Sequence, residues 1–330
     1  MQNNKQNYKI FVNIFIIVTA MIKEKYEQFL QRFDEAPHLK YFHIEDFPNL
    51  KREGFTFMSK ENRINGFFYF YDGYIEDKLV IFCHGIGGGH SSYMKEIDML
   101  AKHGYKVLAY DNTGCCLSEG ENIGAFGQSL VDLSLAIQVL KKDYHFKHIY
   151  VVGHSWGGYA ASNINNFRHV DKVVAISPFI SLKREYRDLF KILSPFIIKK
   201  VMKLEYQING DYAFSNAIDA LNKKDTKALI ITSKDDNVIN FKHHTGLMMK
   251  KVHNPNVEFL IYEDKMHNPM WTKEGVRYYN EEFGTFNKLV KEGKLKTLEE
   301  KKAYFADVDF IFMTTQDENV WSKIYQFLDK

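Results

Sequence analysis

The stretch Tyr150-Val151-Val152-Gly153-His154-Ser155-Trp156-Gly157-Gly158 decides the fold of this chain. A β-branched run leads directly into Gly-x-Ser-x-Gly, and helix-compatible residues follow at positions 159–161. This order predicts a strand, a sharp turn with Ser155 at its apex and a helix behind the serine, which is the layout of a nucleophile elbow. Side chains at 153 and 157 would clash in such a turn, and the helix would point free backbone N–H groups at Ser155.

The size and composition of the chain predict one large domain. Its 330 residues are 45% hydrophobic and 15% aromatic, which is enough to bury a full core. The 44 basic and 41 acidic residues nearly balance, and no basic face is visible, so the pattern argues against nucleic acid as a partner. The three cysteines, Cys83, Cys115 and Cys116, favour a reducing compartment over a disulfide framework, and they lack the spacing of a metal site.

Residues 1–22 form an apolar N-terminal segment ahead of the domain expected at 23–330. Its core, Ile10–Ile22, is shorter than the roughly 20 residues that a membrane span needs. It resembles the core of a signal peptide, but no Ala-x-Ala-like cleavage site follows it. A further alternative is that translation starts at Met21. We expect a cytoplasmic protein, with membrane association through this segment as the alternative.

The rest of the chain alternates between strand and helix patterns, which predicts an α/β fold with a mainly parallel sheet flanked by helices. An antiparallel pair is expected to open the sheet, at 54–58 and 64–71. The further strands are expected at 79–83, 106–110, 148–152, 172–177, 227–232 and 257–262. Helical spacing marks 93–103, 129–140 and the C-terminal residues from 320 onward.

Two segments interrupt this alternation. Residues 178–225 are helical and rich in aromatic residues, and an insertion at this point would cover the carboxyl edge of the sheet as a cap. Phe190 and Phe196 in this segment would either line a substrate pocket or pack between cap and core. Residues 271–315 are a second insertion, whose role the sequence does not indicate.

Four motifs together resemble the α/β-hydrolase superfamily, and within it the monoacylglycerol lipase, lysophospholipase and serine aminopeptidase-like group. They are His84-Gly85-Ile86-Gly87, His90-Ser91-Ser92-Tyr93, Asp111-Asn112-Thr113-Gly114 with Ser118, and Gly153–Gly158. The resemblance covers roughly residues 50–270 and the last helix, and it implies a Ser155-Asp236-His267 triad and no cofactor. Three departures stand out: a glycine run one residue longer than usual, Cys116 in place of a common glycine, and a longer insertion after His267.

The acid of such a triad should follow the strand at 227–232, where Asp235 and Asp236 are adjacent. The apolar pair Val238-Ile239 should anchor this loop to the core. Because the acid usually stands two residues before such a pair, Asp236 is the candidate, and Asp235 is expected to be a solvated turn residue.

The base should lie in the loop after the last strand, and His267 is the last histidine of the chain. The oxyanion hole needs two backbone N–H donors. One is expected from Trp156, the residue after the nucleophile. The other is expected from Ile86, in the glycine-rich loop after the strand at 79–83.

These residues predict a serine hydrolase that forms an acyl-enzyme on Ser155. The apolar 178–225 segment favours an ester with a hydrophobic acyl group, as in a carboxylesterase, lysophospholipase or monoacylglycerol lipase. The expected partner is therefore a small ester or lipid-like molecule, with weak contact to a membrane surface through the basic residues Lys199, Lys200 and Lys203 as a further possibility.

Two rival functions stay open at this point. A serine aminopeptidase-like peptidase would need an acidic pocket for the free amine of its substrate, for which Glu185, Asp188 and Glu205 are scattered candidates. A non-catalytic binding protein on the same scaffold is disfavoured by the intact serine, aspartate and histidine.

Overall fold

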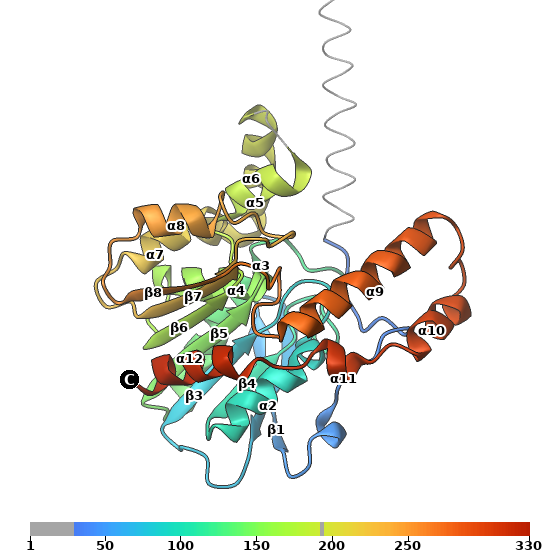
Figure 1. Ribbon diagram of the computed structural model, residues 1–330. Coiled ribbons are helices and arrows are strands. Elements are labelled where there is room, and N and C mark those ends of the chain that lie inside the picture. The colour runs from blue at the N-terminus through green and yellow to red at the C-terminus, as the bar shows by residue number, and fades with distance from the viewer. Residues whose placement is uncertain (1–29, 192–194) are drawn as a thin grey trace, which may run out of the picture.

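The computed structural model describes residues 30–191 and 195–330, and it is built around one eight-stranded sheet with the order β1-β2-β4-β3-β5-β6-β7-β8 (Figure 1). The strands are β1 (Lys51–Ser59), β2 (Asn62–Phe70), β3 (Lys78–Cys83), β4 (Lys106–Tyr110), β5 (His148–His154), β6 (Lys172–Ile176), β7 (Ala228–Ser233) and β8 (Val257–Tyr262). β2 pairs antiparallel with β1 and β4, and the strands from β4 to β8 run parallel. The predicted sheet, with its antiparallel opening pair, is confirmed.

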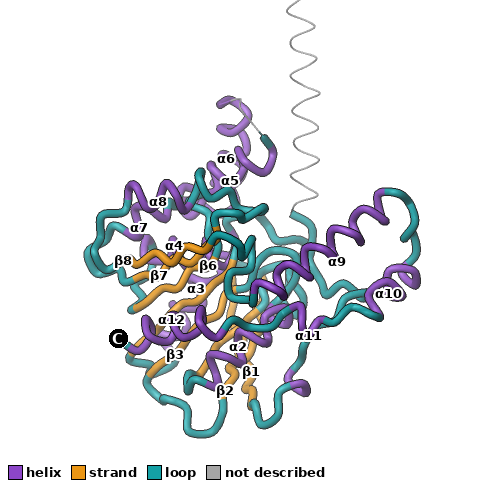
Figure 2. Tube along the Cα trace, viewed as in Figure 1, coloured by secondary structure: helices purple, strands orange, loops and turns teal. Residues whose placement is uncertain are grey.

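Helices cover both faces of this sheet (Figure 2). They are α2 (Met94–Lys102), α3 (Gln128–Asp143), α4 (Trp156–Asn163), α5 (Leu182–Phe190), α6 (Pro195–Asn209), α7 (Ala217–Leu221), α8 (Thr245–Lys251), α9 (Lys273–Lys291), α10 (Leu298–Ala306), α11 (Phe310–Met313) and α12 (Glu318–Asp329). Short 3₁₀ turns lie at Ile44–Asp46, His90–Tyr93, Ile164–Asn166 and Gly210–Phe214.

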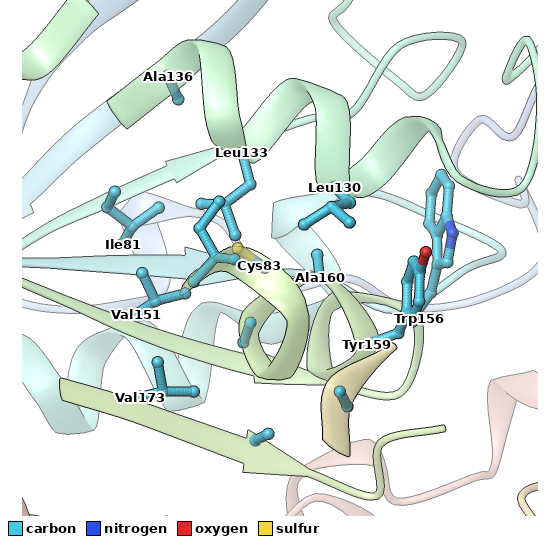
Figure 3. Packing of buried hydrophobic residues seen from close by; sticks show 14 of the residues in the cluster. Ile81, Cys83, Leu130, Leu133, Ala136, Val151, Trp156, Tyr159, Ala160 and Val173 are labelled. Carbon is cyan, nitrogen blue, oxygen red and sulfur yellow. The ribbon is translucent and has the colours of Figure 1, made fainter. Parts of the chain in front are cut away.

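Successive side chains along a strand point to opposite faces of the sheet, so the buried core forms two clusters, one on each face. On β5, Val151 points into the cluster formed with α3 and α4, whereas Tyr150 and Val152 point into the cluster formed with α2 and α12. Figure 3 shows Leu130 and Leu133 of α3 packed over the first of these faces. Because both faces are buried, these strands read as continuous apolar runs rather than as alternating ones.

The two insertions differ in how they meet the sheet. Within 178–225, α7 packs into the core through Ala217 and Leu221, whereas α5 and α6 project beyond the sheet (Figure 1) and join the same core cluster through residues such as Tyr186 and Val201. Within 271–315, α9 runs outward from the sheet with α10 beside it (Figure 1). A separate cluster around Phe305, Phe310 and Met313 holds this second group together.

The apolar segment at 1–22 lies outside the described residues. Across residues 30–191 and 195–330, the structure contains no helix that is both long enough and apolar enough to cross a membrane.

Candidate active site

The turn between β5 and α4 places Ser155 at a sharp apex. Its backbone has φ of 56° and ψ of −114°, a conformation that a non-glycine residue adopts only under constraint. A Cβ on Gly153 would lie 2.3 Å from the Gly157 carbonyl oxygen, and a Cβ on Gly157 would lie 2.1 Å from the Cys83 carbonyl oxygen. Both glycines are therefore required by close backbone approach, as the motif predicts.

Asp236 lies in the turn after β7 and contacts His267, which follows β8. The two carboxylate oxygens lie 3.1 Å and 2.9 Å from His267 Nδ1. The backbone N–H groups of Val238 and Ile239 each donate to Asp236 Oδ1 at 2.9 Å, which fixes the carboxylate. Ile239 is buried and anchors the loop, but Val238 is 59% exposed, so only half of the expected apolar anchor forms.

Asp235 is an exposed turn residue, as expected, but it also makes contacts that the sequence does not indicate. Its side chain is exposed, yet Oδ1 accepts hydrogen bonds from the Met266 N–H at 3.0 Å and from Ser233 Oγ at 2.5 Å. Met266 has φ of 43° and directly precedes His267. Asp235 therefore holds the loop that carries the histidine, whereas Asp236 contacts the histidine ring.

Ser155 and His267 open onto the same cavity, which has a volume of about 500 Å³. Its walls come from the loop after β3, the elbow, the loop after β7, the loop after β8 and helix α9. The lining residues are Gly85, Ile86, Ser92, Tyr93, His154, Ser155, Asn237, Val238, His267, Asn268, Trp271, Tyr279, Asn280, Phe283, Gly284 and Asn287. The three predicted triad residues thus meet at one edge of the sheet, where the parallel strands end.

The two expected oxyanion donors lie on either side of the serine. Trp156 begins α4, and Ile86 lines the cavity. The Gly85 N–H donates to the Tyr93 hydroxyl at 3.1 Å, whereas no described residue accepts a hydrogen bond from the Ile86 or Trp156 N–H. The extra glycine of the loop is accommodated because Gly87, with φ of 100°, faces open space.

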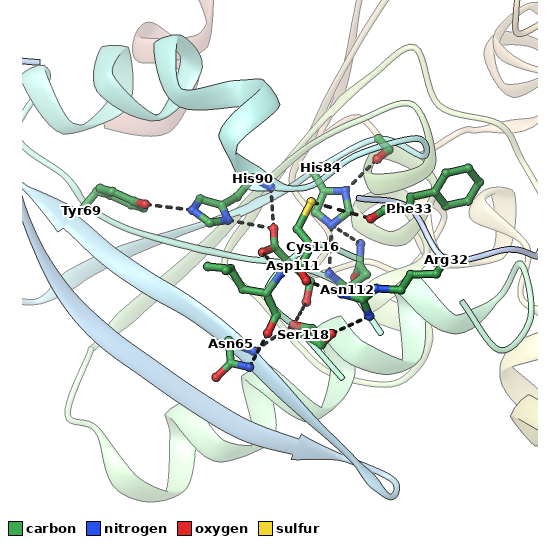
Figure 4. A network of polar contacts seen from close by, with 12 residues as sticks. Arg32, Phe33, Asn65, Tyr69, His84, His90, Asp111, Asn112, Cys116 and Ser118 are labelled. Atoms are coloured by element: carbon green, nitrogen blue, oxygen red, sulfur yellow. Dashed lines mark hydrogen bonds and ion pairs between the residues drawn. The ribbon is translucent and has the colours of Figure 1, made fainter. Parts of the chain in front are cut away.

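A buried polar network lies beneath this loop (Figure 4). Asp111 Oδ1 accepts from the His90 backbone N–H at 2.7 Å and lies 2.8 Å from His90 Nδ1, while His90 Nε2 lies 2.9 Å from the Tyr69 hydroxyl. Burial alone would raise the pKa of Asp111, but the His90 contacts outweigh it and lower that pKa. The charged carboxylate ties the loop to the end of β4.

Cys116 occupies a position that suits glycine. Its φ is 39°, in the left-handed region, and its carbonyl oxygen accepts a hydrogen bond from Arg32 Nη2. This conformation accounts for the glycine that is common at this position in the resembling family.

Sequence reasoning missed the role of His154, the variable residue inside the Gly-x-Ser-x-Gly pattern. The Tyr93 hydroxyl, which accepts from Gly85, lies 2.9 Å from His154 Nδ1, and His154 Nε2 lies 2.8 Å from the His267 carbonyl oxygen. Burial and the neighbouring His267 lower the pKa of His154 to about 3, so the ring is neutral. Its Nε2–H therefore donates to the His267 carbonyl oxygen, and this chain of bonds connects the glycine-rich loop after β3 with the loop after β8 that carries His267.

The aromatic residues of the 178–225 segment do not line this cavity. Phe196 is 77% exposed, and Phe190 packs partly buried against the core. Helix α9 of the second insertion supplies the wall instead.

In the described part of the chain, no group of three or more histidine, cysteine, aspartate or glutamate side chains is arranged to hold a metal ion.

Residues 75–219 match the family described as "Serine aminopeptidase, S33". Human monoglyceride lipase is 29% identical over 128 residues, and the rat enzyme is 27% identical over 128 residues. Each alignment spans 38% of this chain and 42% of the relative, so the chain matches about two fifths of the length of these relatives.

Solved structures resemble a larger part of the chain. An esterase from Pyrococcus furiosus aligns over 80% of this chain and 98% of its own, with a TM-score of 0.55 and 21% identity. Acetyl xylan esterase 1 from a Thermoanaerobacterium species aligns over 70% and 82%, with a TM-score of 0.50 and 17% identity. At these identities the likeness shows a shared fold.

Proposed function

Because this chain belongs to the α/β-hydrolase superfamily, we propose that it is a serine hydrolase that cleaves carboxylic esters through an acyl-enzyme. One observation carries this proposal. Ser155 at the apex of the elbow shares a cavity with His267, whose Nδ1 lies 2.9 Å from the Asp236 carboxylate. A nucleophile, a base and an acid that orients the base are the three parts that acyl transfer needs.

In the proposed mechanism, Ser155 Oγ attacks the ester carbonyl carbon while His267 Nε2 accepts the hydroxyl proton. Asp236 accepts from His267 Nδ1–H and stabilises the imidazolium that forms. The Ile86 and Trp156 N–H groups stabilise the oxyanion. Collapse of this intermediate breaks the bond to the alcohol, which takes the proton from His267. Water then attacks the acyl-enzyme by the same steps and releases the acid.

The walls of the cavity support a hydrophobic acyl group. Apolar and aromatic side chains such as Ile86, Val238 and Phe283 share the lining with polar ones such as Asn237 and Asn280. The apolar side chains favour an alkyl or aryl group because its burial removes apolar area from water. A carboxylesterase or a lysophospholipase or monoacylglycerol lipase-like enzyme fits this lining, and the bound partner is a small ester or lipid-like molecule.

The positions and environments of Glu185, Asp188 and Glu205 give little support to an aminopeptidase-like enzyme, which needs an acidic pocket for the free amine of its substrate. Glu185, Asp188 and Glu205 do not line the cavity, and none of the cavity-lining residues in the described part is acidic. Burial, together with Asp188 and Asp236, raises the pKa of Glu185 to about 8, so this group is mostly neutral at pH 7. Glu205 accepts hydrogen bonds from the backbone N–H groups of Phe126 and Gly127, a structural role.

A substrate panel separates these functions. We expect kcat/KM to rise from the p-nitrophenyl ester of acetate to that of octanoate, by several-fold per added carbon at most, because each buried methylene contributes about 0.8 kcal/mol. Aminoacyl-anilides should be poor substrates. A flat or falling ester series with rapid cleavage of an aminoacyl-anilide would favour the peptidase, and no turnover of either class would favour a binding protein.

Weak contact with an anionic membrane is a further part of the proposal. Tyr206 and Phe214 are exposed and line a groove of about 560 Å³ together with Lys199 and Lys203, and Phe196, next in sequence to the lining residue Pro195, is also exposed. Lysines beside apolar side chains suit a surface of anionic lipid. The protein should sediment with phosphatidylserine vesicles more than with phosphatidylcholine vesicles, and Lys199→Glu with Lys203→Glu should abolish the difference. Equal sedimentation with both vesicles would contradict it.

A reducing, cytoplasmic location completes the proposal. Cys83, Cys115 and Cys116 are all free thiols, and an adjacent pair such as Cys115 and Cys116 is unusual in a disulfide framework. When cells are quenched with acid and the protein is denatured, alkylation without prior reduction should modify no fewer cysteines than reduction followed by alkylation. A mass difference between the two treatments would contradict this location.

A further inference from the structure

Helix α9 begins a few residues after His267. Hydrogen bonds join the start of the helix to the loop after β8, which carries His267. The Lys265 ammonium group donates to the Trp271 carbonyl oxygen at 2.6 Å and pairs with Asp317. Thr272 caps the helix, accepting from the Gly275 N–H at 3.2 Å. The position of α9 beside Ser155 and His267 is therefore set by contacts at its N-terminal end.

Aromatic packing joins α9 to α10. The Tyr279 and Phe283 rings lie 4.5 Å apart between centroids, and Phe283 lies 5.3 Å from Phe305 of α10. Phe305 and Met313 are buried in the cluster that joins α9, α10 and α11. Such contacts stabilise the helix as a wall rather than as a loose arm.

The side of α9 that faces the cavity is one helical stripe. Tyr279, Phe283 and Asn287 are each four residues apart, as are Asn280 and Gly284, which places them on one face of the helix, and all five line the cavity. The stripe extends the cavity away from Ser155 along the helix.

The two glycines of α9, Gly275 and Gly284, differ in whether their surroundings leave room for a side chain. A Cβ on Gly275 would lie 2.6 Å from the Met313 carbonyl oxygen, so packing against α11 requires this glycine. A Cβ on Gly284 would meet nothing within 4 Å, and its φ is not in the left-handed region. Neither packing nor conformation requires glycine at 284, although glycine within a helix costs about 0.5–1 kcal/mol relative to alanine.

We propose that α9 is the specificity wall of the active site and that Gly284 leaves the space into which an acyl chain longer than acetyl extends. The chain lies along Phe283 and passes over Gly284, where any side chain would occupy the same space. This inference rests on the proposed ester hydrolysis and names the element that selects its acyl group. The second insertion then has a function that the 178–225 segment was expected to perform.

The test compares Gly284→Leu with Thr285→Leu. Thr285 is the adjacent exposed position, does not line the cavity, and points about 100° away around the helix. The measured quantity is the ratio of kcat/KM for p-nitrophenyl octanoate to that for the acetate. Gly284→Leu should lower this ratio at least tenfold, since a leucine displaces several methylenes of the chain. Thr285→Leu should leave it within about twofold of the wild-type value.

The outcomes separate this inference from the proposed function. An unchanged ratio in Gly284→Leu, or equal losses on both esters, overturns the specificity wall even where wild-type ester hydrolysis is normal. No ester hydrolysis by the wild-type protein overturns the proposed function itself. Leucine favours a helix more than glycine does, so the melting temperature of Gly284→Leu should match or exceed that of the wild type. Gly284→Ala, which adds one carbon, should give an intermediate ratio.

Discussion

Ser155→Ala should reduce kcat for p-nitrophenyl esters by several orders of magnitude while the fold stays intact. The substitution removes only the hydroxyl oxygen at the apex of the elbow, so the loss is of the nucleophile rather than of packing. A residual rate above that in water should persist, because the oxyanion donors and the cavity are unchanged. Steady-state kinetics and a thermal melt measure the two effects.

Ser162→Ala is the matched control for this variant. Ser162 lies on the same helix, α4, and its hydroxyl donates to the Tyr159 carbonyl oxygen away from the cavity. Its loss should leave kcat nearly unchanged. Full activity of Ser155→Ala, or an equal loss in both variants, would rule out Ser155 as the nucleophile.

Asp236→Asn should lower kcat on the order of 10⁴-fold, as the loss of the acid does in other triads. The amide leaves the imidazole in the wrong tautomer, because an Asn nitrogen cannot accept from His267 Nδ1–H. The hydrogen bonds from Val238 and Ile239 can persist to the amide oxygen, so the turn should keep its shape. A preserved melting temperature would show that the loss is chemical.

Asp235→Asn is the control at the adjacent position, with an expected loss below about tenfold. An Asn oxygen can still accept hydrogen bonds from the Met266 N–H and from Ser233 Oγ, so the loop that carries His267 should keep its conformation. The reverse ranking of the two variants would mean that Asp235 orients the base.

The parts of the fold that follow from local patterns could be predicted from the sequence. The β-branched run before Gly153 and the glycine at 157 specify the elbow, because close backbone approach on both sides excludes any side chain. The positions of the strands follow from their apolar runs. The position of Asp236, two residues before the Val238-Ile239 pair, predicts the carboxylate that lies beside His267.

The origin of the cavity wall could not be predicted, because it depends on how distant segments pack. The aromatic content of 178–225 indicated a substrate cap, yet α7 is a core helix and Phe196 faces outward. Tyr279 and Phe283 carry the helical spacing of a packed face, but only the cluster with Phe305 determines which side of α9 faces Ser155. Likewise, the contact of His154 with His267 joins two loops that are more than one hundred residues apart.

Covalent labelling tests the central claim most directly. The wild-type protein should be incubated with a fluorophosphonate probe, digested, and the modified peptide located by mass spectrometry. We expect one adduct on Ser155, because the elbow exposes its hydroxyl beside His267 in the cavity. Labelling should be absent in Ser155→Ala. An adduct on another serine, or ester hydrolysis that continues while Ser155 stays unlabelled, would contradict the account.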